Sequence, residues 1–272
     1  MIRFAANVGF LYPDRPYLDR FRAARDDGFE AVESAWPIVG ADAFARAVRD
    51  AGLRVALLNV EAGDLEAGDR GRTNDPAAIE RWRADVRAAL SLADRVDCPV
   101  LNVLAGNRVA DVPIASQLEC LRTNLEWALG EAASAGRSVV VELLNPFDTP
   151  AYLVTSLADV DALVAPHAQL GLGLQFDTYH VARIEPDLTT AFRRLAPLVR
   201  HIQVADHPGR HEPGSGAIDW AAFFDAVGAP GYDGAIGLEY RPLADTTGGL
   251  DWLHPRFRRW SAASAALVAS TF

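Results

Sequence analysis

The sequence predicts an α/β protein built as a single (β/α)8 barrel, and three observations lead to this fold class. Short apolar runs of strand length alternate with longer segments of helical period, as expected when parallel strands are covered by helices. Eight such units can be counted along the chain. The chain has 272 residues, a length at which a barrel of this kind commonly forms one domain. A doubly wound open sheet would give a similar alternation and stays open as an alternative to closure.

Each predicted strand is short and mostly apolar, which suits a strand buried between a barrel interior and a layer of helices. The eight strands are RFAANV from Arg3, FEAVES from Phe29, LRVALLN from Leu53, PVLNVL from Pro99, SVVVELL from Ser138, LGLGLQFD from Leu170, RHIQVAD from Arg200 and AIGLEY from Ala235.

Helices are predicted in the segments between these strands. PYLDRFRAARDDG ends at Gly28 and ADAFARAVRDAG ends at Gly52, and glycine commonly ends a helix because it readily adopts the left-handed conformation. A longer helical stretch runs from Ala77 to Asp94, and a late helix is expected to begin near Asp219. No Pro/Gly/Ser-rich linker or internal repeat divides the chain, so residues 1–272 are expected to form one domain.

Composition predicts a cytoplasmic protein. The hydrophobic share is 50% and the mean hydropathy is +0.04, and no charge-free apolar run approaches the ~20 residues needed to cross a bilayer. The N-terminal segment lacks the small-residue cleavage pattern of a signal peptide. Cys98 and Cys120 lie at no metal-like spacing and are expected to be reduced thiols.

Charge excludes several function classes. The net charge of −10 disfavours nucleic-acid binding, which depends on Lys and Arg neutralising phosphates. The chain contains no lysine, so Schiff-base aldolases, pyridoxal-phosphate enzymes and Walker-type phosphate loops lack their required amine.

The GLG within LGLGLQFD lacks the rest of the dinucleotide fingerprint, and no nucleotide cofactor is expected. We expect no membrane partner either, and composition leaves a homo-oligomer open.

Polar residues interrupt four of the last strands. Each of them carries an oxygen ligand, and the four residues are Glu142, Asp177, Gln203 and Glu239. The carboxyl ends of barrel strands meet at one mouth, so these side chains are expected to converge. Burying three carboxylates together is costly unless a cation compensates them. The set therefore predicts a hard divalent cation, Mg²⁺ or Mn²⁺. Taken singly, any one of them could be a strand-end residue bonded to a neighbouring loop.

Further candidates for substrate binding lie near the same strand ends. His180 follows Asp177 by three residues, and a neutral imidazole there could donate a hydrogen bond to a substrate oxygen. The Gly/Pro-rich loop ADHPGRHEPGSGAIDW suits a substrate-facing loop and contributes His207 and Arg210. Arg210 could hold a carboxylate by two hydrogen bonds, either that of the substrate or that of Glu212.

The spacing of these four ligands, with FDTYH and VADHPGRHEPGSGAIDW between them, resembles the hydroxypyruvate isomerase family of the xylose-isomerase-like TIM barrels. The resemblance runs from RFAANVGFLY through AGDLEAGDRG and ELLNPFDTP to GLDWL near the end. Many related sugar isomerases and epimerases place His where Gln203 stands, so Gln203 favours the hydroxypyruvate type.

The resemblance implies that Glu142, Asp177, Gln203 and Glu239 hold the metal and that Glu142 and Glu239 also move protons between adjacent substrate carbons. Asn59 is taken as a further substrate contact. Members of the family carry His just before the Asn-x-x-Ala-Gly-Asp stretch, whereas this chain has Leu58. Residues 253–272 extend beyond the usual end and are expected to form a C-terminal helical extension.

We therefore expect a metal-dependent aldose–ketose type isomerase, an intramolecular oxidoreductase that interconverts hydroxypyruvate and tartronate semialdehyde through an enediolate. The nearest alternative is an isomerase or epimerase of a related 2-oxo acid, such as 2-oxotetronate, or of a ketose. A metal-dependent dehydratase of a cyclic polyol ketone would use the same proton abstraction but lose water. A phosphodiesterase or DNA-repair nuclease would need more His ligands and a basic face, and a barrel that only binds a sugar acid is the non-enzyme alternative.

Overall fold

The computed structural model describes residues 3–229 and 232–253. Eight parallel strands pair in sequence order, and β8 returns to pair with β1, so the sheet is a closed barrel. The strands are β1 (Arg3–Asn7), β2 (Ala31–Ser34), β3 (Arg54–Asn59), β4 (Val100–Val103), β5 (Ser138–Glu142), β6 (Leu172–Asp177), β7 (Val199–Val204) and β8 (Ala235–Leu238). The predicted fold class is confirmed, and the open-sheet alternative is wrong.

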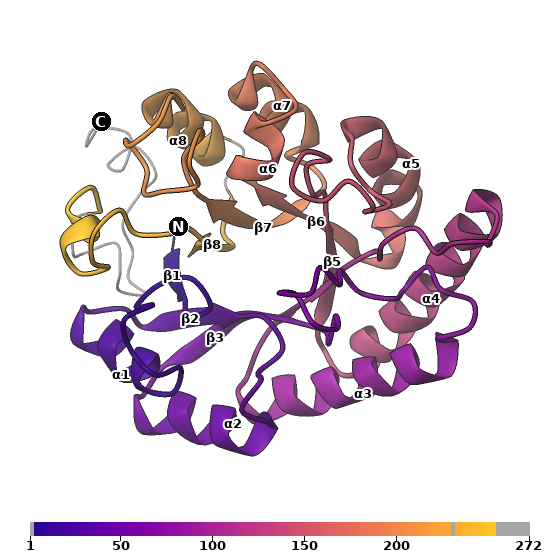
Figure 1. Cartoon of the computed structure of the whole chain (residues 1–272), viewed down its shortest axis with the longest axis horizontal. Coiled ribbons are helices and arrows are strands. Elements are labelled where there is room, and N and C mark those ends of the chain that lie inside the picture. The colour runs from indigo at the N-terminus through magenta and orange to yellow at the C-terminus, as the bar shows by residue number, and fades with distance from the viewer. Residues whose placement is uncertain (1–2, 230–231, 254–272) are drawn as a thin grey trace.

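Helices surround the strands on the outside of the barrel (Figure 1). They are α1 (Asp19–Asp26), α2 (Ala41–Asp50), α3 (Ile79–Arg95), α4 (Ile114–Ser134), α5 (Leu157–His167), α6 (Thr178–Ala182), α7 (Leu188–Leu195) and α8 (Trp220–Gly228), with short 3-10 turns at η1 (Ala168–Leu170) and η2 (Gly248–Leu250). None of the described helices is long and apolar enough to cross a membrane.

Local sequence sets where several helices begin and end. Gly28 and Gly52 follow α1 and α2 with φ of 89° and 65°, a conformation in which a side chain would be strained. At the start of α8, the carboxylate of Asp219 accepts a hydrogen bond from the N–H of Ala222 at 3.0 Å. That contact is a regular helix N-cap. The expected helix stops and the expected start near Asp219 are confirmed.

Side chains along β5 and β8 alternate between an apolar layer under the helices and the barrel interior, which is polar near the carboxyl ends of the strands. In β5, Val139 and Val141 belong to the large apolar cluster beneath the helices, whereas Glu142 hydrogen-bonds with side chains of other strands. In β8, Ile236 and Leu238 belong to that cluster, and Glu239 follows at the mouth. Helix packing therefore fixes the register that turns the polar residues inward.

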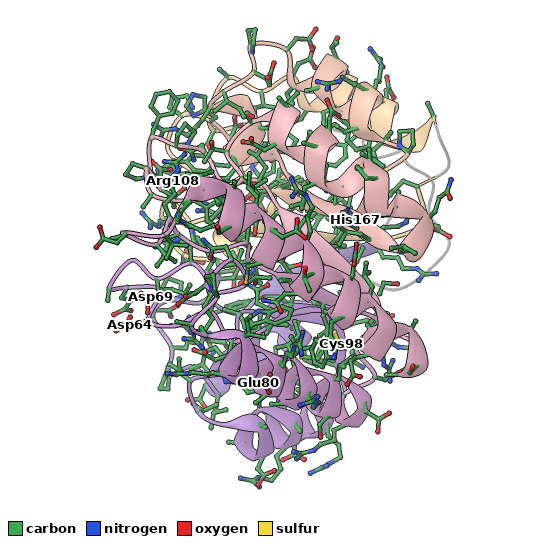
Figure 2. All side chains as sticks on the ribbon, turned by 90° about the vertical axis from the view of Figure 1, so that its right-hand side faces the viewer. Asp64, Asp69, Glu80, Cys98, Arg108 and His167 are labelled. Atoms are coloured by element: carbon green, nitrogen blue, oxygen red, sulfur yellow. The ribbon has the colours of Figure 1, made fainter. Side chains whose placement is uncertain are left out.

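The loops after the strands gather at one end of the barrel. Figure 2 shows Asp64, Asp69 and Arg108, from loops after β3 and β4, along one edge of the molecule. Cys98 and His167, which precede β4 and β6, lie away from that edge. Cys98 and Cys120 are both free and buried, and burial raises the pKa of the Cys98 thiol to about 12. The thiol of Cys98 is therefore protonated at neutral pH.

The described chain contributes to one barrel, and the expectation of a single domain stays a prediction. The expected C-terminal helical extension, residues 253–272, lies outside the described residues except for Leu253, which is buried.

Candidate active site

A cavity of about 820 Å³ opens at the carboxyl ends of the strands. Five of the residues expected at the site line it, and these are Asn59, Glu142, His180, Arg210 and Glu239. They come from strand ends and loops that are far apart in sequence. The sequence-based expectation that these residues meet at one mouth agrees with this arrangement.

Three carboxylates lie at this mouth, and two of them, Asp177 and Glu239, share one guanidinium. Glu142 ends β5 and Asp177 ends β6, and both are buried, while Glu239 directly follows β8 and is 15% exposed at its side chain. Nη2 of Arg210 donates to Oδ2 of Asp177 at 3.2 Å and to Oε1 of Glu239 at 2.6 Å. A single positive charge is thus set against three negative ones.

Arg210 is held in place from both sides. Its guanidinium lies 4.7 Å from the ring centre of Phe10 and 4.9 Å from that of Tyr179, distances at which cation–π attraction operates. Its backbone has a φ of 58°, which is uncommon for a residue with a side chain. The alternative pairing with Glu212 is wrong, because the Glu212 carboxylate instead accepts a hydrogen bond from the N–H of Leu243 at 3.1 Å.

The carboxylates hold protons more tightly than ordinary acids. Burial, reinforced by the negative charge of Asp177, raises the pKa of Glu142. Burial also raises the pKa of Asp177, although Arg210 partly offsets it. The pKa of Glu239 lies well above its ordinary value, again chiefly because of burial. Carboxyl groups with raised pKa values are suited to taking up and returning protons near neutral pH.

His180 presents a neutral ring whose N–H lies near the carboxylates without a hydrogen bond to them. Its Nδ1 accepts from the backbone N–H of Asn145 at 3.0 Å, so the proton of the neutral ring is on Nε2. That Nε2 lies 3.6 Å from Oδ2 of Asp177 and 4.0 Å from Oε1 of Glu142. Burial, followed by the positive charges of Arg210, Arg70 and Arg183, lowers the pKa of His180 well below its ordinary value.

Gln203 is held by a buried carboxylate that the sequence analysis overlooked. Glu33, on β2, is fully buried, and its Oε1 accepts from Nε2 of Gln203 at 2.6 Å across the barrel interior. Its Oε2 accepts from Nε2 of His201 at 2.6 Å. The Oε1 of Gln203 in turn accepts from Nε2 of Gln175 at 2.6 Å. Because Glu33 can only accept, the Gln203 amide must turn its nitrogen toward Glu33 and its oxygen away from it.

Other overlooked residues tie this interior network to both candidate glutamates. Nδ2 of Asn7 donates to Glu33 and to Oε2 of Glu239, at 2.9 Å in each case. Nδ2 of Asn102 donates to Oε2 of Glu142 at 3.1 Å. Asn7 and Asn102 are polar residues inside the apolar strands RFAANV and PVLNVL. The sequence analysis singled out polar residues only in the last four strands, and the same criterion applied to the first four would have found both.

Two positions stand differently from expectation. His207 lies in another cavity, with residues of the α6–α7 connection and the start of α8, and it does not line the mouth. His207 is thus placed outside the mouth cavity, and its role as a substrate contact stays a prediction. Leu58 belongs to the apolar cluster under the helices, whereas its neighbour Asn59 lines the mouth. The departure from the family pattern at Leu58 thus faces away from the cavity.

The carboxylate of Glu33 is tightly packed against Gly237 on β8, and a substitution at Gly237 tests this packing. A Cβ added at Gly237 would overlap the Glu33 carboxylate, so Gly237→Ala should destabilise the protein by about 1–3 kcal/mol. Thermal unfolding measures this. Gly130, within α4, has open space around its Cβ position, and Gly130→Ala should be neutral or stabilising by up to about 1 kcal/mol. Equal behaviour of the two variants would contradict the packing argument.

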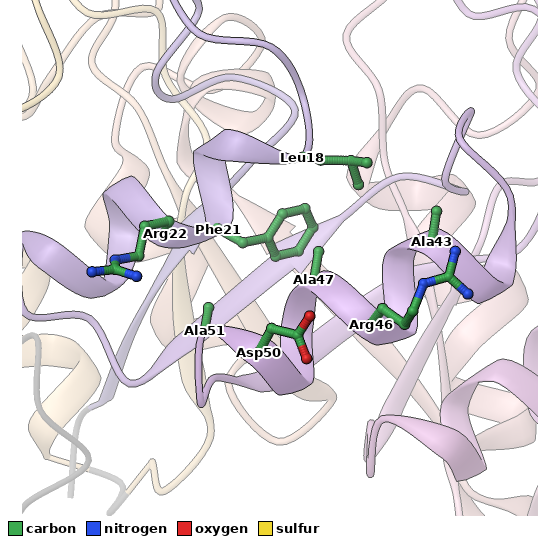
Figure 3. A pocket seen from close by; sticks show the side chains of 8 residues that line it. All are labelled: Leu18, Phe21, Arg22, Ala43, Arg46, Ala47, Asp50 and Ala51. Carbon is green, nitrogen blue, oxygen red and sulfur yellow. The ribbon is translucent and has the colours of Figure 1, made fainter.

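A smaller cavity of about 340 Å³ lies on the outside of the barrel between α1 and α2 (Figure 3). Phe21 and several alanines line it, and its polar members are Arg22, Arg46 and Asp50 on helix surfaces. These residues offer no group of converging carboxylates. The candidate site is therefore the mouth of the barrel.

The residues at the mouth fit a divalent cation. Ligand atoms of Glu142, Asp177 and His180 all lie within 4.8 Å of one another. Because the Nε2 of His180 carries a proton, the ligands that this group offers are the carboxylate oxygens of Glu142 and Asp177, which a hard cation such as Mg²⁺ or Mn²⁺ prefers. Among the described residues, the buried Oε1 of Gln175 and the buried Nε of Arg210 have no hydrogen-bond partner. Buried polar atoms of this kind suit a site that binds ligands.

Residues 21–256 match the family model described as xylose isomerase-like TIM barrel. Over 260 residues the chain is 38% identical to the 2-oxo-tetronate isomerase of Cupriavidus necator, covering 95% of this chain and 100% of that protein. It is 31% identical over 256 residues to the hydroxypyruvate isomerase of Escherichia coli, covering 94% of this chain and 99% of that protein. A solved structure from Brucella melitensis, described as an AP endonuclease of family 2, superposes with a TM-score of 0.88 at 32% identity, covering 94% of this chain and 99% of that one.

Proposed function

Because this chain belongs to the xylose isomerase-like TIM barrel family and is an isomerase of a small 2-oxo acid, we propose that it interconverts hydroxypyruvate and tartronate semialdehyde. The single observation that carries the proposal is the group of carboxylates at the barrel mouth: Asp177 lies near Glu142 and shares the guanidinium of Arg210 with Glu239. This set provides both a place for a divalent cation and two carboxyl groups that can exchange protons with a substrate.

Glu142, Asp177, Gln203 and Glu239 are the residues that we propose hold the cation, which is Mg²⁺ or Mn²⁺. When bound, the cation supplies charge stabilisation for the enediolate that forms when a proton leaves the carbon beside a carbonyl. His180 is not included because its Nε2 is a donor. No nucleotide cofactor is proposed, since a proton transfer between neighbouring carbons needs no redox partner.

Proton transfer is assigned to Glu142 and Glu239. The two residues lie on β5 and directly after β8, so a substrate in the cavity has a carboxyl group on either side. One carboxylate removes the proton from one carbon, and a protonated carboxyl group returns one to its neighbour. The Nε2–H of His180 and the unpartnered Nε of Arg210 are proposed to donate hydrogen bonds to substrate oxygens, and Asn59 contacts the substrate from the third strand end.

A second candidate substrate is the four-carbon acid 2-oxotetronate. The 38% identity over the whole length of the Cupriavidus necator protein favours it, and a cavity of about 820 Å³ has room for the additional carbon. A nuclease function is not supported, because the net charge of −10 is unsuited to a phosphate backbone. A cytoplasmic location and a homo-oligomer stay predictions.

Proton NMR in D2O tests the proposal. Hydroxypyruvate and 2-oxotetronate are each incubated with the protein and either Mg²⁺ or Mn²⁺. An isomerase should convert hydroxypyruvate to the aldehyde tartronate semialdehyde, or 2-oxotetronate to the 3-oxo acid, with deuterium entering at the carbon that exchanges. A product lighter by one water would identify a dehydratase instead. Neither conversion nor exchange with either acid would contradict the proposed function.

A further inference from the structure

Three arginines line the mouth cavity, and they differ in how their charges are used. Arg210 shares Nη2 with Asp177 and Glu239. Arg241 is exposed at the outer part of the cavity. Arg70, in the loop after β3, is half-buried and makes no ion pair with any residue that the structure describes. Arg70 is therefore an ordered positive charge in the cavity that no described carboxylate neutralises.

The guanidinium of Arg70 is fixed by backbone groups alone. Its Nη1 donates to the carbonyl oxygens of Leu65 at 2.9 Å and of Asp69 at 2.6 Å. Within the described part of the chain these are its hydrogen bonds, so the edge formed by Nε and Nη2 is open to a ligand. Such an edge matches the two oxygens of a carboxylate, which arginine binds through paired, parallel hydrogen bonds.

The loop that carries Arg70 is anchored directly after it. Arg72 pairs with Glu61 and with Asp85 of α3, at 2.7 Å in each case. Gly71 has a φ of 85°, and a Cβ there would press on the backbone of Leu104 after β4. The loop therefore holds Arg70 at the barrel mouth with little freedom.

Two acidic residues of the same loop, Asp64 and Asp69, are engaged elsewhere. Asp69 accepts from the N–H of Asp64, and Asp64 accepts from the N–H groups of Glu66 and Ala67. Figure 2 shows Asp64 and Asp69 along the edge of the molecule where the loops after the strands gather. These carboxylates stabilise the turn and leave Arg70 unneutralised.

Arg70 lines the same cavity as Glu142, His180 and Glu239. Its charge contributes to the lowered pKa of His180 and opposes the rise in the pKa of Tyr152. The hydroxyl of Tyr152 hydrogen-bonds to the backbone carbonyl of Glu142 at 3.2 Å. The positive charge of Arg70 is thus felt on the β5 side of the cavity, beside Glu142.

We propose that Arg70 binds the carboxylate of the 2-oxo acid and so selects charged acids over neutral sugars. The inference rests on the proposed function and moves the carboxylate-binding role from Arg210, whose Nη2 is occupied, to Arg70. Arg210 keeps the task of neutralising Asp177 and Glu239 and of contacting a substrate oxygen. The carboxylate of the acid lies toward the β3 loop, and its hydroxy-carbonyl end lies between Glu142 and Glu239.

Binding of glycerate, an acid that cannot isomerise, tests this by isothermal titration calorimetry in the presence of Mg²⁺. Arg70→Gln should weaken glycerate binding about 10- to 100-fold, the range expected for a charged, paired hydrogen bond. Arg70→Lys should be intermediate, because lysine keeps the charge but loses the planar two-point contact. Arg241→Gln removes a charge from the same cavity and should bind glycerate as the unaltered protein does.

Turnover supplies the second readout. With hydroxypyruvate, Arg70→Gln should raise KM by a similar factor while kcat changes much less. With dihydroxyacetone, in which CH2OH replaces the carboxylate, the same variant should leave kcat/KM unchanged. This double difference isolates the contact between Arg70 and the carboxylate from any general loss of structure.

Three results would overturn the inference: no binding of glycerate by the unaltered protein, normal binding by Arg70→Gln, or equal losses in Arg70→Gln and Arg241→Gln. The last would mean that the cavity attracts anions only by its overall potential. Loss of glycerate binding in Arg70→Gln, together with no turnover of hydroxypyruvate or 2-oxotetronate by the unaltered protein, would support the role of Arg70 and contradict the proposed function.

Discussion

Replacing either Glu142 or Glu239 by glutamine is expected to slow isomerisation by about 100-fold or more while metal still binds. Glutamine keeps the size of the side chain and one oxygen ligand but cannot accept or return a proton. Because the two residues come from different strands of the barrel, at the end of β5 and directly after β8, and each is proposed to handle one of the two carbons, each loss should stop a different half of the reaction. The variant lacking the base should lose solvent deuterium exchange, whereas the other should retain exchange with little net conversion.

The measurements are NMR turnover in D2O and metal content by elemental analysis. Glu119→Gln, on the exposed surface of α4, is the matched control and should behave as the unaltered protein does. A Glu142→Gln or Glu239→Gln protein with near-normal turnover at saturating metal would remove that residue from proton transfer.

Removing divalent cations is expected to abolish activity, and adding Mg²⁺ or Mn²⁺ should restore it. The physical reason is that Arg210, which pairs with Asp177 and Glu239, leaves the buried carboxylate of Glu142 without an ion pair to it. Metal that binds only the folded protein should also raise its melting temperature. At a metal concentration of 100 times the dissociation constant, the free energy of unfolding should increase by about 2.7 kcal/mol. Full activity after exhaustive chelation, confirmed by elemental analysis, would contradict metal dependence.

The effect of pH on this stabilisation has a definite sign. Burial raises the pKa values of Glu142, Asp177 and Glu239, so the folded metal-free protein keeps protons that the unfolded chain has already lost. Its free energy of unfolding should therefore fall as pH rises above the ordinary carboxyl range and through the raised pKa values. Metal binds the ionised carboxylates, so its stabilising effect should grow over the same range. Asp177→Asn removes one ionisable ligand and should diminish the stabilisation by metal over this pH range.

The fold and much of the site were predictable because both follow from local patterns. Eight apolar strands with helices between them leave few arrangements, and strand ends in a barrel meet at one mouth. Glu142, Glu239 and His180 were located in this way. The positions of Arg210 and His207 were harder, since both belong to one irregular loop in which no periodicity says which side chain turns inward.

Contacts across the barrel interior could not be predicted from sequence. Glu33 and His201 are 168 residues apart, and their strands, β2 and β7, are not neighbours in the sheet. Strand order therefore says nothing about this pairing, which depends on the depth of each side chain in the interior. The same limit applies to Arg70, because only the folded loop reveals which of its arginines is already paired.

The contact between Glu33 and Gln203 also restricts which side chains can replace Gln203. A residue there must donate on the side of Glu33 and offer a lone pair on the other side, and both an amide and a neutral imidazole have this pair of functions. Glutamine and neutral histidine therefore both meet this requirement at position 203. A glutamate would face Glu33 as a second anion and could not replace either. The identity of residue 203 is therefore governed as much by its partner in the barrel interior as by the ligand in the cavity.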